Sequence, residues 1–184
     1  MQIGALPRNS QGYSIGELLW VIVILGIIAA LALPRLDWIR YRINAEARNV
    51  TLQLAYAQRL AVSLQHNVLV TVDHANRRLT VDEDANNDGL YGSNERRRVI
   101  QLQDGVNFES NGVASLPSPS PSNELTRITY RRDGSADQTG VVYLNTLRGG
   151  ALGNNNDARA LEIVRSTGRA FWYRYTSAGW AKGQ

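Results

Sequence analysis

The stretch GYSIGELLWVIVILGIIAALALP, residues 12–34, decides the fold of this 184-residue chain. Leu18 to Leu33 carry no charge, and the only charged side chain in residues 13–33 is the carboxylate of Glu17. A helix over these 21 residues would be about 32 Å long, which matches the hydrocarbon core of a bilayer. The stretch therefore predicts a single transmembrane helix.

The residues before this stretch, 1–12, are a short polar leader. Its one cation, Arg8, favours a cytoplasmic position under the positive-inside tendency. A secretory signal would be cut after its apolar run, but here the run continues into a charged helix. A carboxylate at the membrane edge needs a partner. If the chain is cut after Gly12, the new α-amino group of Tyr13 lies one helical turn from Glu17 and could pair with it, or with Glu17 of a neighbouring subunit.

The run Gly12-Tyr13-Ser14-Ile15-Gly16-Glu17-Leu18-Leu19, with the apolar stretch and Pro34 after it, resembles the class III signal of type IV pilins and type II secretion pseudopilins. The resemblance implies that a prepilin peptidase cuts between Gly12 and Tyr13 and that Tyr13 is N-methylated. It also implies that Glu17 acts in filament assembly and that Pro34 bends the helix. Two positions depart from the pattern, because Tyr13 replaces the commoner phenylalanine and Gly16 a bulky apolar residue. The alternative is an ordinary signal anchor with an incidental Glu17.

The same resemblance implies a location and a set of partners. The chain would be a single-pass protein of the bacterial inner membrane with its C-terminal domain in the periplasm, and later part of a pilus or pseudopilus. Its partners would be other pilins or pseudopilins, bound through the N-terminal helix, the prepilin peptidase, and an inner-membrane assembly platform.

Residues 34–66 continue the helix with an amphipathic pattern. Apolar residues recur every three or four positions, which predicts one buried stripe: Ile39, Ile43, Ala47, Val50, Leu54, Ala57, Ala61 and Leu64. The opposite face, expected to be solvated, carries Arg40, Arg42, Glu46, Arg48 and Arg59. Pro34 lacks an amide hydrogen and predicts a kink or local melting between the two helix halves.

Residues 67–184 change to a period of two, which predicts short antiparallel strands: Val68–Val72, Leu79–Val81, Val99–Gln101, Ile128–Tyr130, Val141–Tyr143, Leu161–Ile163 and Ala170–Arg174. Residues 111–123 are rich in Pro and Ser and predict an exposed flexible loop. The predicted fold is α+β, with a long helix, first transmembrane and then amphipathic, packed on a C-terminal antiparallel sheet domain. The runs from Ile128 to Gly134 and from Ile163 to Arg169 resemble minor pseudopilins of the GspH and FimT kind.

A calcium loop is a second candidate site. Asp84, Asn86, Asp88 and Glu95 have the spacing D-x-[DN]-x-[DN]-G-x₅-E, in which oxygen ligands alternate around a glycine turn. The flanking segments read as strands, so a plain polar hairpin loop is the competing interpretation. Apart from this Ca²⁺ site we expect no cofactor.

A third candidate is the mixture of arginines and aromatic residues near the C-terminus. Arg165, Arg169 and Arg174 lie among Phe171, Trp172, Tyr173, Tyr175 and Trp180, a combination that can contact DNA phosphates and stack on bases. Proteins resembling FimT can bind DNA through a Gly-Arg-x-Arg segment, but here Phe171 replaces its second arginine. Strand alternation also separates Arg169 from Arg174. The competing interpretation is a terminal strand whose aromatic residues fill the core.

Composition narrows the functional classes. There is no cysteine, so disulfides and Cys-based sites are excluded. The net charge is +4, and all but one of the 20 cations are arginine, a bias that suits phosphate contacts but also follows from codon composition. The two histidines, His66 and His74, accompany no nucleophile motif, and Asp73 beside His74 reads as turn chemistry. We therefore expect no enzyme but a minor pilin or pseudopilin of an initiation or tip complex, or alternatively a DNA-binding minor pilin for natural transformation.

Overall fold

The structure is a computed structural model that describes residues 12–32, 38–110, 112–117, 124–148, 151–152 and 155–183. The chain forms two compact units, Met1–Asp37 and Trp38–Gln184. The first unit contains one described helix, α1 (Ile15–Ala32). No helix among the described residues is both long enough and apolar enough to be recognised as a membrane span.

Among the described residues, the predicted helix over residues 13–66 corresponds to α1 and α2 (Trp38–Leu64). Residues 33–37 lie outside the described residues, and with them Pro34 and its expected kink. Most of the predicted leader, residues 1–11, also lies outside them.

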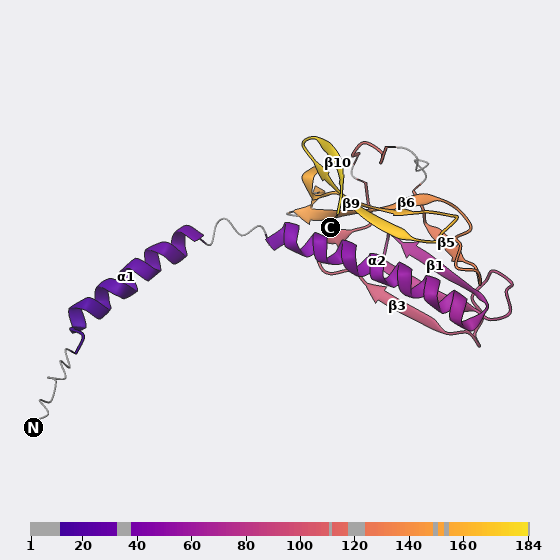
Figure 1. The fold of residues 1–184 in the computed structure, drawn as a ribbon, viewed down its shortest axis with the longest axis horizontal. Coiled ribbons are helices and arrows are strands. Elements are labelled where there is room, and N and C mark those ends of the chain that lie inside the picture. The colour runs from indigo at the N-terminus through magenta and orange to yellow at the C-terminus, as the bar shows by residue number, and fades with distance from the viewer. Residues whose placement is uncertain are drawn as a thin grey trace, which may run out of the picture. The chain divides into compact units, whose positions relative to one another are not determined.

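Helix α2 packs on the second unit with the predicted apolar stripe. Figure 1 shows it lying along the strands, and it contacts strands of both sheets. Six of the stripe residues are buried: Ile43, Ala47, Val50, Leu54, Ala57 and Ala61. Leu64, at the last turn, is 44% exposed.

The prediction that Glu46 is solvated is wrong. Its side chain is buried, its Oε1 accepts a hydrogen bond from the backbone N–H of Gln103 at 3.0 Å, and its Oε2 accepts one from the Asn49 amide at 3.2 Å. Next to it Arg42 donates to the carbonyl oxygen of Asp104 at 2.8 Å. The loop after residue 101 therefore folds back onto the polar edge of α2, a long-range contact that helical spacing does not reveal.

Two antiparallel sheets form the rest of the unit. The first has the order β3-β2-β1-β5 and the second the order β10-β9-β8-β6-β4, with β7 paired to β6. Their bounds are β1 Asn67–Asp73, β2 Arg78–Asp84, β3 Arg97–Gln101, β4 Val106–Asn107, β5 Arg127–Tyr130, β6 Gly140–Arg148, β7 Ala151–Leu152, β8 Arg159–Ile163, β9 Ala170–Thr176 and β10 Gly179–Lys182, with a 3-10 turn η2 at Asn155–Asp157. The α+β prediction is confirmed, and all seven predicted strands are present.

The main core lies between α2 and the two sheets, and all its members come from the second unit. Its largest side chains are Tyr130, Phe108, Ile43, Leu54, Leu79 and Ile128. Within the described residues, this core therefore contains no side chain of α1.

A smaller cluster covers the other face of the second sheet. Leu116 packs there with Val141, Tyr143 and Ala160, against partly buried Trp180. The Tyr143 hydroxyl accepts the backbone N–H of Leu116 at 3.2 Å. Among the described residues 112–117, Gly112, Ala114, Ser115 and Pro117 are exposed as predicted, whereas Val113 and Leu116 are buried.

Candidate functional site

The residues of the predicted processing and assembly site begin α1. Ser14 and Glu17 form a reciprocal cap. The backbone N–H of Gly16 donates to Ser14 Oγ at 3.3 Å, and the N–H of Ser14 donates to Glu17 Oε2 at 3.2 Å. The Ser-x-x-Glu pattern of residues 14–17 is the sequence signal for this cap. In the uncut chain Glu17 thus partners the N–H of Ser14, not an α-amino group of Tyr13.

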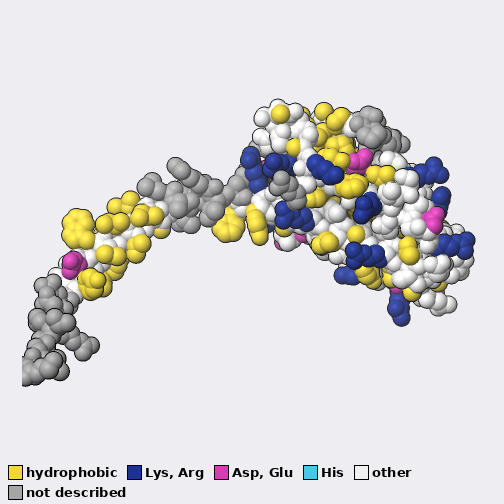
Figure 2. Space-filling model, in the orientation of Figure 1, with side chains coloured by type: hydrophobic (Ala, Val, Ile, Leu, Met, Phe, Trp, Pro, Cys, Tyr) yellow, Lys and Arg dark blue, Asp and Glu magenta, His cyan; other side chains and the backbone are white. Residues whose placement is uncertain are grey.

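The surface of α1 beyond this cap is apolar on every side. Each large apolar side chain from Leu18 to Ile28 is between 42% and 68% exposed, and since these residues are almost consecutive they point in all directions around the helix. Figure 2 shows the apolar surface along this helix. A helix that is apolar all round needs lipid or other helices around it.

The predicted calcium loop is a closed polar turn between β2 and β3. The carboxylate of Asp84 is buried, and its two oxygens accept the backbone N–H groups of Asp88 at 2.9 Å and Gly89 at 3.0 Å. Glu95 accepts the N–H groups of Ala85 at 2.9 Å and Gly92 at 2.6 Å. The sequence-predicted oxygen donors are thus drawn together, but they are engaged with the loop's own backbone.

Within the described residues no group of three or more His, Asp or Glu side chains is placed to hold a metal ion. The hydrogen bonds above are sufficient to hold the loop as a polar hairpin. Calcium binding by Asp84, Asn86, Asp88 and Glu95 stays a prediction.

The three predicted DNA-binding arginines are divided between two places. Arg165 and Arg169 are exposed and lie in one tight turn, in which the N–H of Val164 donates to the carbonyl of Arg169 at 3.0 Å. Arg174 lies further along β9, opposite Arg159 of β8. Five residues of strand separate Arg169 from Arg174, which is about 17 Å.

A second pair of exposed arginines, Arg131 and Arg132, lies beside the Arg165 turn. The two turns are joined by the N–H of Ala136, which donates to the carbonyl of Arg165 at 2.9 Å. The Gln58 amide of α2 also clamps them, donating to the carbonyls of Gly134 at 2.8 Å and Thr167 at 2.6 Å. We call the four side chains Arg131, Arg132, Arg165 and Arg169 the turn arginines.

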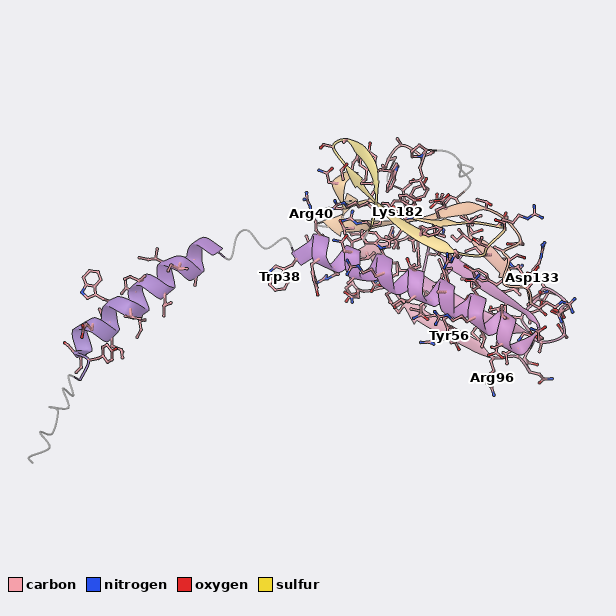
Figure 3. All side chains as sticks on the ribbon, in the orientation of Figure 1. Trp38, Arg40, Tyr56, Arg96, Asp133 and Lys182 are labelled. Carbon is pink, nitrogen blue, oxygen red and sulfur yellow. The ribbon has the colours of Figure 1, made fainter. Side chains whose placement is uncertain are left out.

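Arg174 instead belongs to a cavity of about 290 Å³ near the start of α2. We call this cavity the arginine pocket, because its walls carry Arg40 of α2, Arg159 of β8 and Arg174 of β9. Asn44, Asn156 and Tyr175 to Ser177 complete its lining. Figure 3 shows Arg40 at the first turns of α2 and Asp133, from the turn that carries Arg131 and Arg132, at the other end of the unit.

Arg159 is the buried member of the arginine pocket, only 3% exposed. Its Nε donates to Asn44 Oδ1 at 2.7 Å, and its Nη1 donates to the carbonyls of Asn156 and Ala158 at 3.0 and 2.8 Å. The pKa of Arg159 is lowered to about 10, mainly by burial; Asp157 opposes this decrease, and nearby Arg40 and Arg174 add to it. The pocket is therefore electropositive.

The C-terminal aromatic residues are partly buried and pack against neighbouring side chains. Tyr173 donates to Glu162 Oε2 at 2.7 Å, and the rings of Tyr175 and Trp180 meet edge to face at 5.1 Å. Trp172 faces α2, where Arg48 lies over its ring at 5.8 Å. They favour the interpretation of a packed terminal strand.

Asp73 stabilises a turn, as predicted. Its carboxylate accepts hydrogen bonds from the backbone N–H of Asn76, the Asn76 amide and Arg78 Nε, at 3.0, 2.8 and 2.8 Å. The neighbouring ring of His74 instead lies 6.1 Å from that of Phe108. These contacts offer no acid–base pair.

Comparison with known proteins agrees with the resemblance to GspH that the sequence predicted. Residues 46–168 match the family described as Type II transport protein GspH, which is more than half of the chain. The chain belongs to the GspH family. This is a family of structural pseudopilin subunits and not of enzymes. The match begins after α1, so residues 12–34 of this GspH-family chain lie outside it.

Two solved structures of the minor pseudopilin EpsH from the type II secretion system of Vibrio cholerae are similar to this chain. One is 14% identical with a TM-score of 0.45, over 71% of this chain and 92% of that chain. The other is 12% identical with a TM-score of 0.39, over 77% and 96% of the two chains. No curated protein matches the sequence.

Proposed function

We propose that this chain is a minor pseudopilin subunit of a type II secretion pseudopilus or a related type IV pilus, made as a single-pass protein of the bacterial inner membrane. A prepilin peptidase cuts between Gly12 and Tyr13, and Tyr13 becomes the N-methylated terminus. The β-rich unit lies in the periplasm. The subunit then enters the filament, at its initiation or tip complex, through α1.

The observation that carries this proposal is the all-round apolar surface of α1, attached to a unit whose core, among the described residues, contains no side chain of α1. Because α1 does not contribute to that core, its apolar side chains are available for lipid and then for the helices of neighbouring subunits. Membership of the GspH family supports the same role.

Processing is tested by expressing the full chain with a prepilin peptidase and measuring the mass of the product by mass spectrometry. We expect wild type to lose the mass of residues 1–12 and Gly12→Val to keep it. A side chain at Gly12 meets no atom within 4 Å, so the substitution changes recognition by the peptidase and not the fold. Wild type that keeps its leader would contradict the proposal.

The assembly role of Glu17 is tested separately from its role as a cap. Glu17→Gln keeps an oxygen for the N–H of Ser14 but removes the charge, whereas Ser14→Ala removes the hydroxyl side of the cap and keeps the carboxylate. We expect Glu17→Gln to be processed normally but to fail in filament incorporation, and Ser14→Ala to be incorporated. Equal incorporation of wild type and Glu17→Gln would refute the proposal that the charge acts in assembly.

A second candidate function is DNA binding by the turn arginines. The observation that favours it is that Arg165 and Arg169 are held beside Arg131 and Arg132 by the Gln58 clamp, so four exposed guanidinium groups lie on adjoining turns. Asp133 lies in the same turn as Arg131 and Arg132, and it accepts hydrogen bonds from Ser135.

This candidate is tested by titrating the full chain in detergent with duplex DNA at several salt concentrations. Four phosphate contacts predict a slope of log K against log salt of about −4, and Arg165→Gln with Arg169→Gln should reduce it by about 2. Arg40→Gln with Arg174→Gln removes the same charge elsewhere and should leave the slope unchanged. No binding at low salt, or equal losses in the two variants, would exclude a DNA site at the turns.

A further inference from the structure

The arginine pocket holds more positive than negative charge. Three guanidinium groups, from Arg40, Arg159 and Arg174, share the pocket wall, while the buried carboxylate of Asp157 lies 3.8 Å from Arg40 Nε. The hydroxyl of Thr146 also donates to Asp157, at 2.9 Å, which fixes this carboxylate in place. The three cations lie in one wall, and the lining contains no acidic side chain among the described residues, so the pocket suits an anion.

The strand register brings two of these cations together. Arg159 and Arg174 are directly opposite one another in the antiparallel pair of β8 and β9. Like charges in such a pair are destabilising, because their Cβ atoms are only about 5 Å apart. A ligand with negatively charged oxygens between them would remove this cost.

The donors of the pocket differ in their availability. Arg159 is buried, and its Nε and Nη1 are already bonded to Asn44 and to backbone carbonyls. Arg174 is exposed, and the side chain of Arg40 is 49% exposed, so both can meet a ligand from outside. Arginine forks bind phosphate oxygens in a bidentate manner. The adjoining cavity, which also has Arg174 in its wall, adds Lys182.

The sequence position of the pocket limits where its ligand can be. Arg40 follows Ala32, the last residue of α1, by eight residues, and eight residues of chain extend at most about 28 Å. If α1 lies in the bilayer, Arg40 therefore stays within this distance of the membrane segment.

Two aromatic side chains at the start of α2 point to the same surroundings. Trp38 is 66% exposed and Tyr41 is 74% exposed, and Figure 3 shows Trp38 projecting from the first turn of the helix. Exposed Trp and Tyr are typical of the headgroup level of a membrane. Aromatic and arginine side chains together favour a lipid surface over free phosphate in solution.

We infer that the arginine pocket binds the phosphate of an anionic phospholipid headgroup at the periplasmic surface of the inner membrane, with Arg40 and Arg174 contacting its oxygens. This inference rests on the proposed function, because it needs α1 to be in the membrane. Bound lipid would hold the β-rich unit at the headgroups until the subunit leaves for the filament.

The test is native mass spectrometry of the full chain in non-ionic detergent, with phosphatidylglycerol or phosphatidylcholine added. Wild type should retain phosphatidylglycerol in preference to phosphatidylcholine. Arg40→Gln with Arg174→Gln should weaken this retention roughly 25-fold, since each cation near an anionic surface contributes about fivefold. The matched control, Arg165→Gln with Arg169→Gln, should retain the lipid as wild type does.

Two further measurements keep the result interpretable. Thermal unfolding shows whether the pocket variant is folded, and Arg174→Lys, which keeps the charge but not the fork, should recover part of the retention. Inorganic phosphate is the competing ligand, and it should displace phosphatidylglycerol only at concentrations far above those of the lipid.

Three outcomes would overturn the inference. They are equal retention of the two lipids, equal losses in the pocket variant and its control, and binding of inorganic phosphate to the pocket without any lipid preference. If the chain is cut after Gly12 and stays in the membrane fraction but shows no lipid preference, this inference alone is refuted. If the chain is not cut, the proposed function is refuted.

Discussion

Gly168→Ala should strongly destabilise the β-rich unit, because Gly168 lies where three parts of the chain meet. Its φ is +62°, a left-handed conformation that costs an alanine about 1 kcal/mol or more. A Cβ there would lie 2.1 Å from the carbonyl oxygen of Gly134 and 2.8 Å from Gln58 Nε2. The methyl group must therefore push apart the two turns that the Gln58 clamp holds together.

The expected magnitude follows from the contacts that would be lost. The two hydrogen bonds from Gln58, to Gly134 and Thr167, contribute about 1 kcal/mol each. Adding the conformational cost gives a loss of about 3 kcal/mol. For a unit of this size, a loss of 1 kcal/mol lowers the melting temperature by about 2 to 4 °C, so Gly168→Ala should lower it by roughly 10 °C.

The assay is thermal unfolding followed by circular dichroism, with Gly89→Ala as the matched control. Gly89 also has a positive φ, +78°, but a Cβ there meets no atom within 4 Å. It should therefore show the conformational cost alone, a drop of about 4 °C. Equal drops in the two variants would refute the argument that the contact with Gly134 matters.

A double-mutant cycle then checks the mechanism. Gln58→Ala removes the clamp without straining the backbone, and it should cost about 2 kcal/mol. Gly168→Ala should cost less in that background than in wild type, because the clamp that it disrupts is already absent. Additive losses would show that Gly168 and the clamp act independently.

Three other predictions follow from single sites. Glu46→Ala should lower the free energy of unfolding, measured by urea titration, by roughly 2 kcal/mol, because it removes two buried hydrogen bonds to a carboxylate. The control Arg59→Ala, on the exposed face of the same helix, should change this free energy little. If the polar loop binds calcium, Ca²⁺ but not Mg²⁺ should raise the melting temperature, and Asp84→Asn should abolish the increase; no increase with Ca²⁺ would leave a plain hairpin loop. Burial and the hydrogen bond to Glu162 raise the pKa of Tyr173 to about 12, so the stability that its neutral phenol contributes is complete below about pH 10 and is lost as the pH rises toward 12. Tyr173→Phe should flatten this alkaline decline in the urea midpoint, and an unchanged decline would contradict the assignment.

Local periodicity in the sequence was sufficient to predict the helix and strands that bury only one face. The stripe from Ile43 to Ala61 faces the core as its helical spacing predicts. The seven predicted strands were found because each has enough alternating residues to show a period of two. Strand β4 has only two residues, too few to show any period, and β10, Gly179–Lys182, was read as part of the aromatic segment.

Two-sided burial was not predictable in the same way. Strand β8 is buried at every position, since α2 covers one face and the cluster around Leu116 covers the other. Alternation distinguishes the faces of a strand only when one of them meets water. The second layer comes from a Pro- and Ser-rich segment whose two apolar residues gave too weak a signal.

The grouping of the candidate-site arginines was also not predictable from local sequence. Arg165 and Arg169 are close in the sequence and stay close in the structure. Arg174 is nearly as close to them along the chain, yet its neighbours are Arg159, across a strand pair, and Arg40, on a helix more than a hundred residues earlier. Register and helix packing, not spacing, decide which cations act together.

This division explains how one modestly basic unit could serve two surfaces. The arginine pocket lies near the start of α2, close in the chain to the apolar helix, whereas the turn arginines lie beyond its other end, where Gln58 and Val62 meet the turns. The two places are therefore separate candidate sites, one close in the chain to α1 and the other at the far end of α2. One variant, Arg40→Gln with Arg174→Gln, removes two charges at the arginine pocket, and the other, Arg165→Gln with Arg169→Gln, removes two charges at the turns. Because the two variants have the same net charge, a difference between them separates lipid binding from DNA binding.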